Sequence, residues 1–379
     1  MNRRAALKLI GSTAAAALLE GCARRAAHVT GMSPTPDLIK LSRVDVRPEL
    51  ELRTVVGLRP FRPSGFVVRD EKLGDKLIVH NYGHGGGGVT LSWGTAELAV
   101  RIVREAQPQA GAQRVAVLGS GAVGLATARL LQERGYEVKI YAKELPPNTT
   151  SNIAGAQWYP FLVSDSDRRT PEFVRQLVET ARVAHRRFQL MVGDRYGVRW
   201  MPNYYAQSEP FDANGRFGAG NPLREFLVDL TAIERGANPF PLPNVERAQQ
   251  MMIEPSVYLP AVMNDFFIAG GKIAVQEFKS AREIAALPES VIVNCTGLGA
   301  RSLFNDQELI PVKGQLTVLL PQAQVNYAVL FGDYYMFPRS DGILLGGTHE
   351  RDIWTLAPNL DAKRRVMSEH QKFFSGMKV

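Results

Sequence analysis

The sequence predicts an α/β protein built around a dinucleotide-binding βαβ unit, and three observations support this fold class. A chain of 379 residues that is 45% hydrophobic and 22% charged can bury a sizeable core, in two domains or one with a large insertion. Residues 114–144 read as strand, glycine turn, amphipathic helix and strand. Further short strands, bounded by Pro and Gly, are predicted before and after that unit.

Residues 1–22 are predicted to be an export signal. Paired arginines precede an apolar run that ends near Leu19 and is too short to span a membrane. The pattern resembles a twin-arginine signal, whose pathway exports proteins that have already folded and taken up a cofactor. Lipidation of Cys22, simple cleavage and an uncleaved basic anchor stay open as alternatives. We expect an exported protein, either periplasmic or a membrane-anchored bacterial lipoprotein.

Charge and cysteine content restrict the partners. The formal charge is 45 − 37 = +8, and several of the basic residues crowd the first 25 positions. The remaining excess forms no basic stripe with interleaved aromatic residues, so nucleic acid is not an expected partner. Cys295 is the only cysteine besides Cys22, so a mature form with Cys22 lipidated or removed would hold no internal disulfide.

Residues 23–40 lack periodicity and predict a tether, with folded structure beginning near Leu41. Segments 55–70 and 76–82 are typical of short strands, and 94–106 has the apolar spacing of a helix. An unusual glycine-rich turn, "HNYGHGGGGVT" at 80–90, connects the second of these strands to the helix. A flexible connector is expected over 107–113.

The second glycine cluster, "GSGAVG", opens the predicted βαβ unit. Gly119 permits the tight turn, Gly121 lets the backbone approach a pyrophosphate, and Gly124 lets helix and strand pack closely. The helix N-terminus then faces the phosphates. An acidic residue about 20 positions on should accept the ribose hydroxyls, and Glu144 fits although Lys143 beside it is a cation. The predicted contacts of this unit are Gly119, Gly121, Ala122, Val123, Gly124, Lys143 and Glu144.

The segment after that strand offers hydroxyl groups followed by small residues. Hydroxyls can bond phosphate or ribose, and small residues admit a flat ring, although any loop uses such residues. Predicted cofactor contacts here are Thr149, Thr150, Ser151, Ala156 and Gln157. Further on, "ESVIVNCTGLGAR" at 289–301 predicts a buried strand that leaves into a Thr-Gly turn.

These motifs together resemble the FAD-dependent D-amino acid oxidase family, which includes the D-aspartate oxidases. "VAVLGSGAVGLATARLLQERGYEVKIYA" and "TTSNIAGAQWYP" are similar to its N-terminal FAD segment, and "VIVNCTGLGAR" and "PVKGQ" to its central return to the FAD domain. "YYMFPRSDGILLGGTHERDIW" resembles its sheet over the substrate, and "GLRPFRP" and "HNYGHGGGGVTLSWG" its last third. The resemblance implies a Rossmann-like FAD-binding domain plus an antiparallel-sheet substrate domain, with FAD as the cofactor.

The order of the motifs implies a circular permutation. In the family, the arginine and glycine-turn motifs end the chain, whereas here they precede the dinucleotide turn, so the stretch around 41–66 should lie beside the chain's end. The expected segments are 1–22 signal, 23–40 tether, 41–106 permuted segment with the substrate arginine and flavin loop, 107–113 linker, 114–165 FAD-binding βαβ, 166–280 mainly substrate domain, 281–310 return to the FAD domain, and 311–379 substrate sheet and terminal helix.

The resemblance also implies a substrate site. Arg59 stands where the family has an arginine that holds the substrate carboxylate, a task that suits a bidentate guanidinium. Tyr335 matches a tyrosine whose hydroxyl reaches the same carboxylate, and the Gly86 carbonyl would accept from the substrate amine. Amides of the second turn would line the flavin: Gly85, Gly86, Gly87, Gly88, Val89 and Thr90. Without this context, a surface arginine and a core tyrosine would be the ordinary interpretations. His80 and His84 are interpreted as props of the glycine turn.

Departures from the family pattern concern substrate choice. Phe331 replaces a second tyrosine, whose role Tyr334 could take, and Gly87 occupies an often aromatic position. Arg199, Trp200, Tyr204 and Tyr205 are candidates for the side-chain pocket. A second arginine in that pocket would favour acidic D-amino acids.

The implied reaction is hydride transfer from a D-amino acid to FAD, release of the imino acid to give a 2-oxo acid and ammonia, and reoxidation of the flavin by oxygen to give hydrogen peroxide. The expected partners are a small D-amino acid and oxygen, with an oligomer left open. Three alternatives remain: an FAD dehydrogenase that reduces a membrane acceptor, a flavin-free binding protein on the same fold, and a nicotinamide dehydrogenase. No bound metal is expected.

Overall fold

The computed structural model describes residues 37–106, 114–212 and 217–378. The predicted signal, most of the tether and the 107–113 linker lie outside these residues. Ile39–Val379 form one compact unit, to which everything below refers. Within the described residues, no helix has the length and apolar character needed to cross a membrane.

The βαβ unit lies in a six-stranded sheet with strand order β2-β3-β10-β4-β5-β9. All neighbours are parallel except β2 and β3, which form an antiparallel hairpin at one edge. Its strands are β2 (Val67–Leu73), β3 (Lys76–Tyr82), β4 (Arg114–Leu118), β5 (Glu137–Ala142), β9 (Lys272–Val275) and β10 (Val291–Asn294). The predicted strand, turn, helix and strand over 114–144 are confirmed as β4, α2 and β5.

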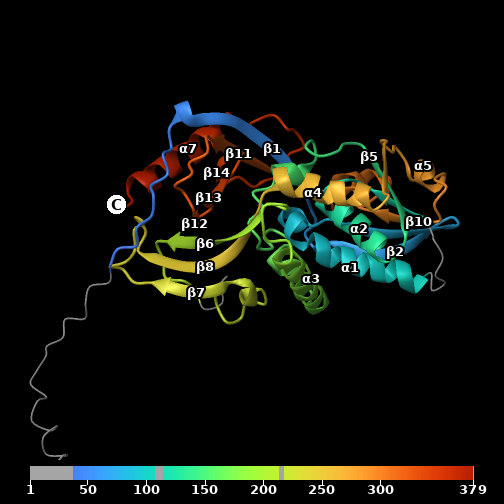
Figure 1. Ribbon diagram of the computed structural model, residues 1–379, viewed down its shortest axis with the longest axis horizontal. Coiled ribbons are helices and arrows are strands. Elements are labelled where there is room, and N and C mark those ends of the chain that lie inside the picture. Colours follow the sequence, from blue (N-terminus) through green and yellow to red (C-terminus); the bar gives the residue numbers. More distant parts are fainter. Residues whose placement is uncertain (1–36, 107–113, 213–216, 379) are drawn as a thin grey trace, which may run out of the picture. The chain divides into compact units, whose positions relative to one another are not determined.

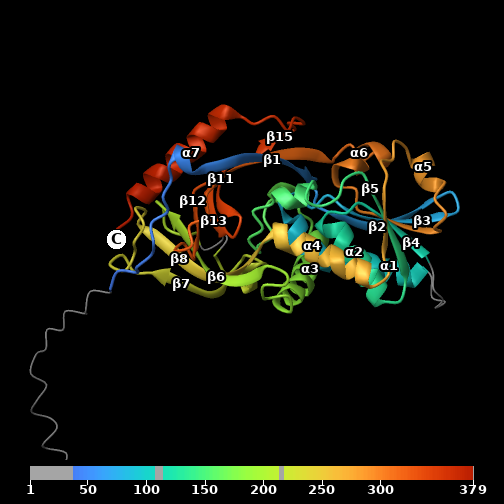
Figure 2. The ribbon, with the colours of Figure 1, turned by 45° about the horizontal axis from the view of Figure 1, so that its top comes forward.

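Helices surround this sheet (Figures 1 and 2). They are α1 (Gly88–Ala106), α2 (Ala122–Glu133), α3 (Pro171–Gln189), α4 (Pro255–Ile268), α5 (Ala281–Ala285) and α6 (Ala300–Leu303). The prediction that the first helix begins at residue 94 is wrong, because the glycine run continues directly into α1 from Gly88. Burial of Val89, Leu91 and Trp93 stabilises these first turns and offsets the low helix propensity of glycine. A Cβ on Gly94 would lie 1.9 Å from the Thr180 carbonyl oxygen, so glycine there lets α1 pack closely on α3.

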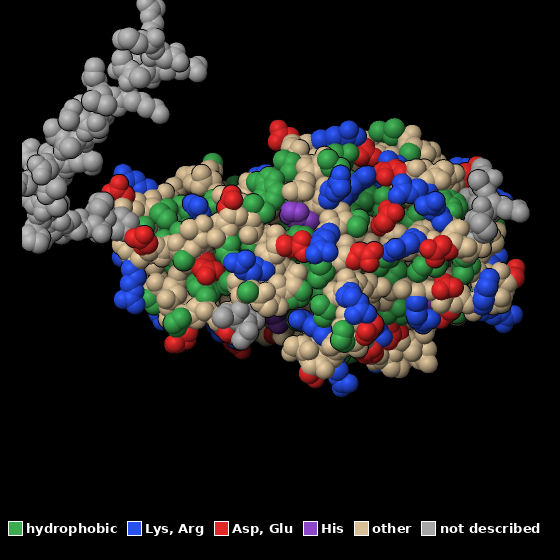
Figure 3. Space-filling model, turned by 90° about the horizontal axis from the view of Figure 1, so that it is seen from below, with side chains coloured by type: hydrophobic (Ala, Val, Ile, Leu, Met, Phe, Trp, Pro, Cys, Tyr) green, Lys and Arg blue, Asp and Glu red, His purple; other side chains and the backbone are tan. Residues whose placement is uncertain are grey.

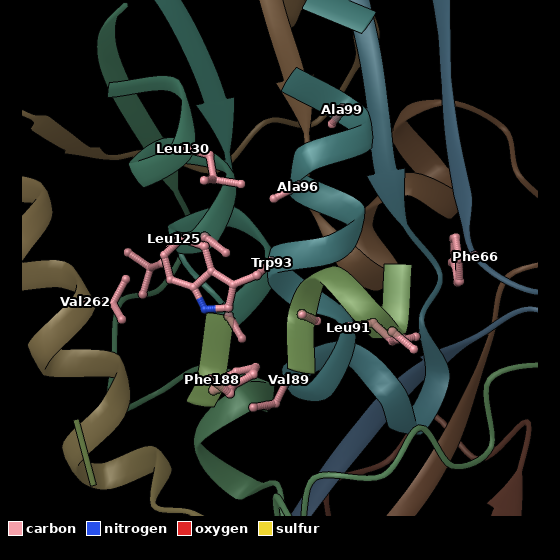
Figure 4. Packing of buried hydrophobic residues seen from close by; sticks show 14 of the residues in the cluster. Phe66, Val89, Leu91, Trp93, Ala96, Ala99, Leu125, Leu130, Phe188 and Val262 are labelled. Atoms are coloured by element: carbon pink, nitrogen blue, oxygen red, sulfur yellow. The ribbon is translucent and has the colours of Figure 1, made fainter. Parts of the chain in front are cut away.

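The core beside α1 holds the helices together (Figure 4). Trp93 is 1% exposed and packs in one cluster with Leu125, Phe188 and Val262, which come from α2, α3 and α4. Its indole N–H donates to the Tyr258 hydroxyl at 2.6 Å, so the buried polar atom is satisfied. Truncating a tryptophan packed in this way costs about 3–5 kcal/mol.

The second sheet follows the order β1-β11-β14-β13-β12-β6-β8-β7, with β15 paired to β11. It is antiparallel apart from the pair β12 and β6, so the predicted antiparallel-rich sheet is confirmed. Its strands are β1 (Glu51–Phe61), β6 (Val198–Gln207), β7 (Val228–Ile233), β8 (Asn244–Ile253), β11 (Ile310–Leu319), β12 (Ala328–Phe331), β13 (Tyr334–Arg339), β14 (Gly342–Gly346) and β15 (Glu350–Arg351). Helix α7 (Leu360–Ser375) packs on it.

The segment 41–106 contributes to both sheets. Strand β1 pairs with β11 over its length, whereas β2, β3 and α1 belong to the parallel sheet and its helices. Arg43 donates to the Met377 carbonyl at 2.7 Å, and Lys363 pairs with Glu51 at 2.7 Å. The start of the folded body therefore lies beside its end, as the unusual motif order predicts.

Candidate active site

One cavity of about 940 Å³ is lined by every motif that the sequence singled out. This volume is at the upper end of the range for ligand pockets, so a large cofactor and a small substrate can share it. All the predicted site residues line the cavity except Gly87. A Cβ on Gly87 would instead approach Val163 and Leu91 in the core.

The turn between β4 and α2 forms the phosphate end of the cavity. Gly119 has φ +106°, and a Cβ there would lie 2.5 Å from the Cys295 carbonyl oxygen, so only glycine fits. Helix α2 begins at Ala122 without a side-chain cap from Gly121. The Ala122 amide donates to the Ser151 hydroxyl at 3.0 Å, which brings the predicted hydroxyl segment against the helix N-terminus. This end of α2 is suited to an anionic phosphate.

The end of β5 carries charges of both signs. Glu144 lines the cavity, and its carbonyl accepts a hydrogen bond from the Ser120 hydroxyl at 2.6 Å. Lys143 forms an ion pair with Glu277 at 2.9 Å, and this hydrogen-bonded carboxylate raises the lysine pKa. Sequence reasoning missed Glu277, because it follows β9, more than 130 positions beyond the dinucleotide turn.

The upstream glycine turn lies against the segment 161–163. Gly85 has φ +55°, and a Cβ there would lie 2.1 Å from the Leu162 carbonyl oxygen. The Gly86 and Gly87 amides donate to the carbonyl oxygens of Leu162 and His84, so these two of the expected flavin-facing amides have protein partners. The turn leads into α1 at Gly88, and Val89 and Thr90 line the cavity.

Arg59 and Tyr335 come together from different strands at one side of the cavity. The Arg59 guanidinium lies over Gly314 of β11, where a Cβ would stand 2.4 Å from its nitrogens. It is close enough for its charge to act on the Tyr335 hydroxyl. It donates one long hydrogen bond, of 3.4 Å, to the Thr348 carbonyl. Across the described residues, no Asp or Glu forms an ion pair with Arg59. A half-buried guanidinium without a counter-ion is a natural anchor for a carboxylate.

Histidines near the site are held neutral. His84 is buried, which lowers its pKa to about 3, and its ring nitrogen meets the Thr95 hydroxyl at 2.9 Å. Burial and the Arg59 charge lower the pKa of His349, which lines the cavity, to about 4. His80, on β3, contacts Glu71 of β2 and Asn294 of β10 and does not line the cavity. The contacts of His80 and His84 are with neighbouring protein side chains, as expected of residues that support the glycine turn.

The structure places only some of the candidate side-chain-pocket residues at the cavity. Phe331 does not line the cavity, because it stacks on Phe373 of α7 with ring centroids 3.9 Å apart. Tyr334 and Tyr205 do line the cavity. The other three candidates of that segment do not: Arg199 is paired with Glu254, and Trp200 and Tyr204 pack in hydrophobic clusters.

Gln157 belongs to a buried amide network that sequence reasoning did not anticipate. Its side-chain nitrogen lies 2.7 Å from the Asn203 oxygen and 2.6 Å from the Gln250 oxygen. The preceding residue, Ala156, has φ +58°, a left-handed conformation that is costly for a residue with a Cβ. Backbone strain next to a cavity-lining amide is consistent with a functional position.

The comparisons with known proteins agree with this architecture. The profile of the family described as FAD dependent oxidoreductase matches residues 114–378, and the chain belongs to this family. A D-amino-acid oxidase of Streptomyces coelicolor is 30% identical over 258 residues, which cover 67% of this chain and 75% of that protein. A D-aspartate oxidase of Homo sapiens is 26% identical over 268 residues, covering 67% and 74%. The crystal structure of glycine oxidase from Geobacillus kaustophilus matches with a TM-score of 0.51 at 15% identity, covering 70% of this chain and 80% of that one, which shows a shared fold.

FAD is the cofactor of this family, and the residues present fit it. The helix N-terminus at Ala122 would hold the diphosphate, and the flavin ring would lie against the cavity wall to which Gly85, Gly86 and Gly88 contribute. Among the described residues, no group of three or more His, Cys, Asp or Glu side chains could hold a metal ion.

Proposed function

We propose that this protein oxidises D-amino acids to 2-oxo acids with release of ammonia, and that oxygen is reduced to hydrogen peroxide. The observation that carries this proposal is the Arg59 guanidinium, which faces the cavity without a described counter-ion and lies beside Tyr335. The similar oxidases act on amino acids, and Arg59 provides the carboxylate recognition that such substrates need.

The protein's own residues orient the substrate. Arg59 binds the α-carboxylate through two parallel hydrogen bonds, and Tyr335 donates a third from β13. Burial raises the Tyr335 pKa, so the phenol stays protonated and acts as a donor. FAD supplies the two-electron acceptor when bound. Overall, a D-amino acid, oxygen and water give a 2-oxo acid, ammonia and hydrogen peroxide.

The proposal is tested by the visible absorption spectrum of the FAD-loaded protein under anaerobic conditions. Addition of a D-amino acid panel containing neutral and acidic members should bleach the flavin bands, and the matching L-panel should not. A yellow protein that no D-amino acid bleaches would refute the substrate class while leaving the cofactor. A protein that cannot be loaded with FAD would favour the binding-protein alternative.

An FAD dehydrogenase is the second candidate, because a lipid on Cys22 would hold the protein at a membrane that carries electron acceptors. The electron acceptor distinguishes the two. After anaerobic reduction by a D-amino acid, admission of oxygen should restore the flavin bands and release one hydrogen peroxide per flavin. Restoration only by a quinone or dye would instead identify the dehydrogenase.

We also propose that the chain is a circular permutant exported by a twin-arginine signal. The family profile begins at Arg114, yet the segment before it supplies Arg59 and the glycine turn to the same cavity. Moving residues 41–106 behind residue 378 should give a protein that still folds and binds FAD. Failure of this rearranged chain to fold, beside a properly folded parent, would contradict the permutation.

A further inference from the structure

The ends of β5 and β9 bring together a charged cluster that the substrate site does not use. The two strands are parallel neighbours, with Ala142 opposite Val275, and the Gln276 amide donates to the Ala142 carbonyl at 2.9 Å. Lys143 and Glu277 therefore leave the sheet side by side, at the same edge as the dinucleotide turn. Both residues line the cavity.

The Glu277 carboxylate is held in place by two ammonium groups. Lys143 approaches one oxygen at 2.9 Å, and Lys279 approaches the other. These hydrogen bonds lower the pKa of Glu277, so it is ionised at neutral pH. Strand β9 is the edge strand next to β5. The ion pair with Lys143 therefore places the Glu277 carboxylate near the end of β5. That is where a dinucleotide fold places the ribose next to its diphosphate.

Glu144, the acid expected from sequence spacing, is less well prepared for this role. Its backbone carbonyl is fixed by Ser120, but its exposed carboxylate makes no hydrogen bond or ion pair with a described residue. Glu277 is also at the surface, but its two ion pairs already restrict its side chain, so ordering it on binding costs less side-chain entropy than ordering Glu144.

We infer that Glu277, positioned by Lys143 and Lys279, is the carboxylate that accepts the ribose hydroxyls of the adenosine half of FAD. The ribose-binding carboxylate would then follow β9 instead of β5, the second strand of the βαβ unit. Lys143 occupies the position directly after β5. The inference concerns cofactor binding and holds whichever substrate is oxidised.

The test is a titration of the full apo-protein with FAD, and with an FAD analogue that lacks the adenosine 2′-hydroxyl, followed by flavin fluorescence. Hydrogen bonds to charged groups contribute enough to change affinity by about tenfold or more. The wild-type protein should prefer FAD over the analogue about tenfold. Glu277→Gln should weaken FAD binding about tenfold and bind both flavins about equally.

Glu144→Gln is the matched control and should retain both the affinity and the preference. Lys143→Met should lower FAD affinity only about threefold, because Lys279 still holds the carboxylate. Glu277 lies at the surface, so the melting temperatures of the apo-variants should equal that of the parent. Loss of the 2′-hydroxyl preference in Glu144→Gln, or its retention in Glu277→Gln, would overturn the assignment.

Discussion

Arg59 lies near the end of β1 and Arg62 directly follows that strand, yet the two arginines have opposite surroundings. Arg62 pairs with Asp306 at 2.8 Å and Glu308 at 2.6 Å, and also donates to the Gly65 carbonyl. Arg59 forms no ion pair with any residue that the structure describes, and it lines the cavity. The same residue type serves the fold at one position and the site at the other, and the presence or absence of a protein counter-ion distinguishes them.

The largest expected effect is on activity at Arg59. Arg59→Met removes the carboxylate anchor and should lower kcat/KM for D-amino acids at least a thousandfold, about 4 kcal/mol of transition-state stabilisation. The free energy of unfolding should stay within about 0.5 kcal/mol of the parent, because no ion pair is broken. Steady-state peroxide production and urea unfolding measure the two quantities. Activity within tenfold of the parent would mean that the carboxylate is bound elsewhere.

Arg62 should show the reverse pattern. Arg62→Met leaves Asp306 and Glu308 without their cation, and should lower the free energy of unfolding by about 3 kcal/mol. Urea unfolding measures this loss, and kcat/KM of the folded fraction should change less than threefold. The double replacement Arg62→Met with Asp306→Asn provides the control, since removing one orphaned charge should recover part of the stability. If Arg62→Met were as stable as the parent, the proposed structural role of Arg62 would be refuted.

The sequence predicted those parts of the fold that depend on local periodicity. The βαβ unit was predictable because strand, turn and helix lie within 31 consecutive residues, and glycine positions there follow from backbone geometry. The motif resemblance placed Arg59 and Tyr335 together, although β1 and β13 are far apart in the chain. Both residues line one cavity.

What sequence reasoning missed depends on contacts between distant segments. Nothing near Lys143 indicates that its partner is Glu277, and nothing near Phe331 indicates that α7 covers it. Likewise the two arginines of "GLRPFRP" look equivalent until Asp306 and Glu308 are seen beside one of them. Alternating charges over the surface in Figure 3 show why ion pairs cannot be assigned from sequence, since each charge has several possible partners.

Tyr335 should show a smaller effect of the same kind as Arg59. Tyr335→Phe keeps the ring that packs on Phe337 at 4.7 Å but removes the hydroxyl beside Arg59. One lost hydrogen bond to a carboxylate should raise KM about tenfold, near 1.4 kcal/mol, with stability nearly unchanged. Stopped-flow reduction of the flavin at increasing D-amino acid concentration separates binding from the chemical step. An unchanged substrate affinity would show that Arg59 acts alone.

The smallest expected effect extends the comparison from arginines to histidines, where His84 serves the fold. Burial lowers its folded-state pKa to about 3, whereas the unfolded chain has the ordinary value of about 6.5. As pH falls through 6.5, the unfolded state takes up a proton that the folded state cannot hold. Stability is therefore full above about pH 6.5 and is lost progressively between 6.5 and 3.

His84→Gln removes this titration while retaining a group that can bond the Thr95 hydroxyl. Between pH 7.5 and 6.0, His84 should account for about 0.8 kcal/mol of the loss in unfolding free energy, and the variant should lose that much less than the parent. Urea unfolding at the two pH values measures the difference. Four other histidines leave a residual pH dependence in both proteins, because burial lowers the pKa of His349 and His370 to about 4 and also lowers the pKa of His80 and His185. If the unfolding free energy of parent and variant depended on pH in the same way, the turn would open enough for His84 to be protonated in the folded state. The upstream glycine turn would then be a more mobile part of the site than its packing against Leu162 indicates.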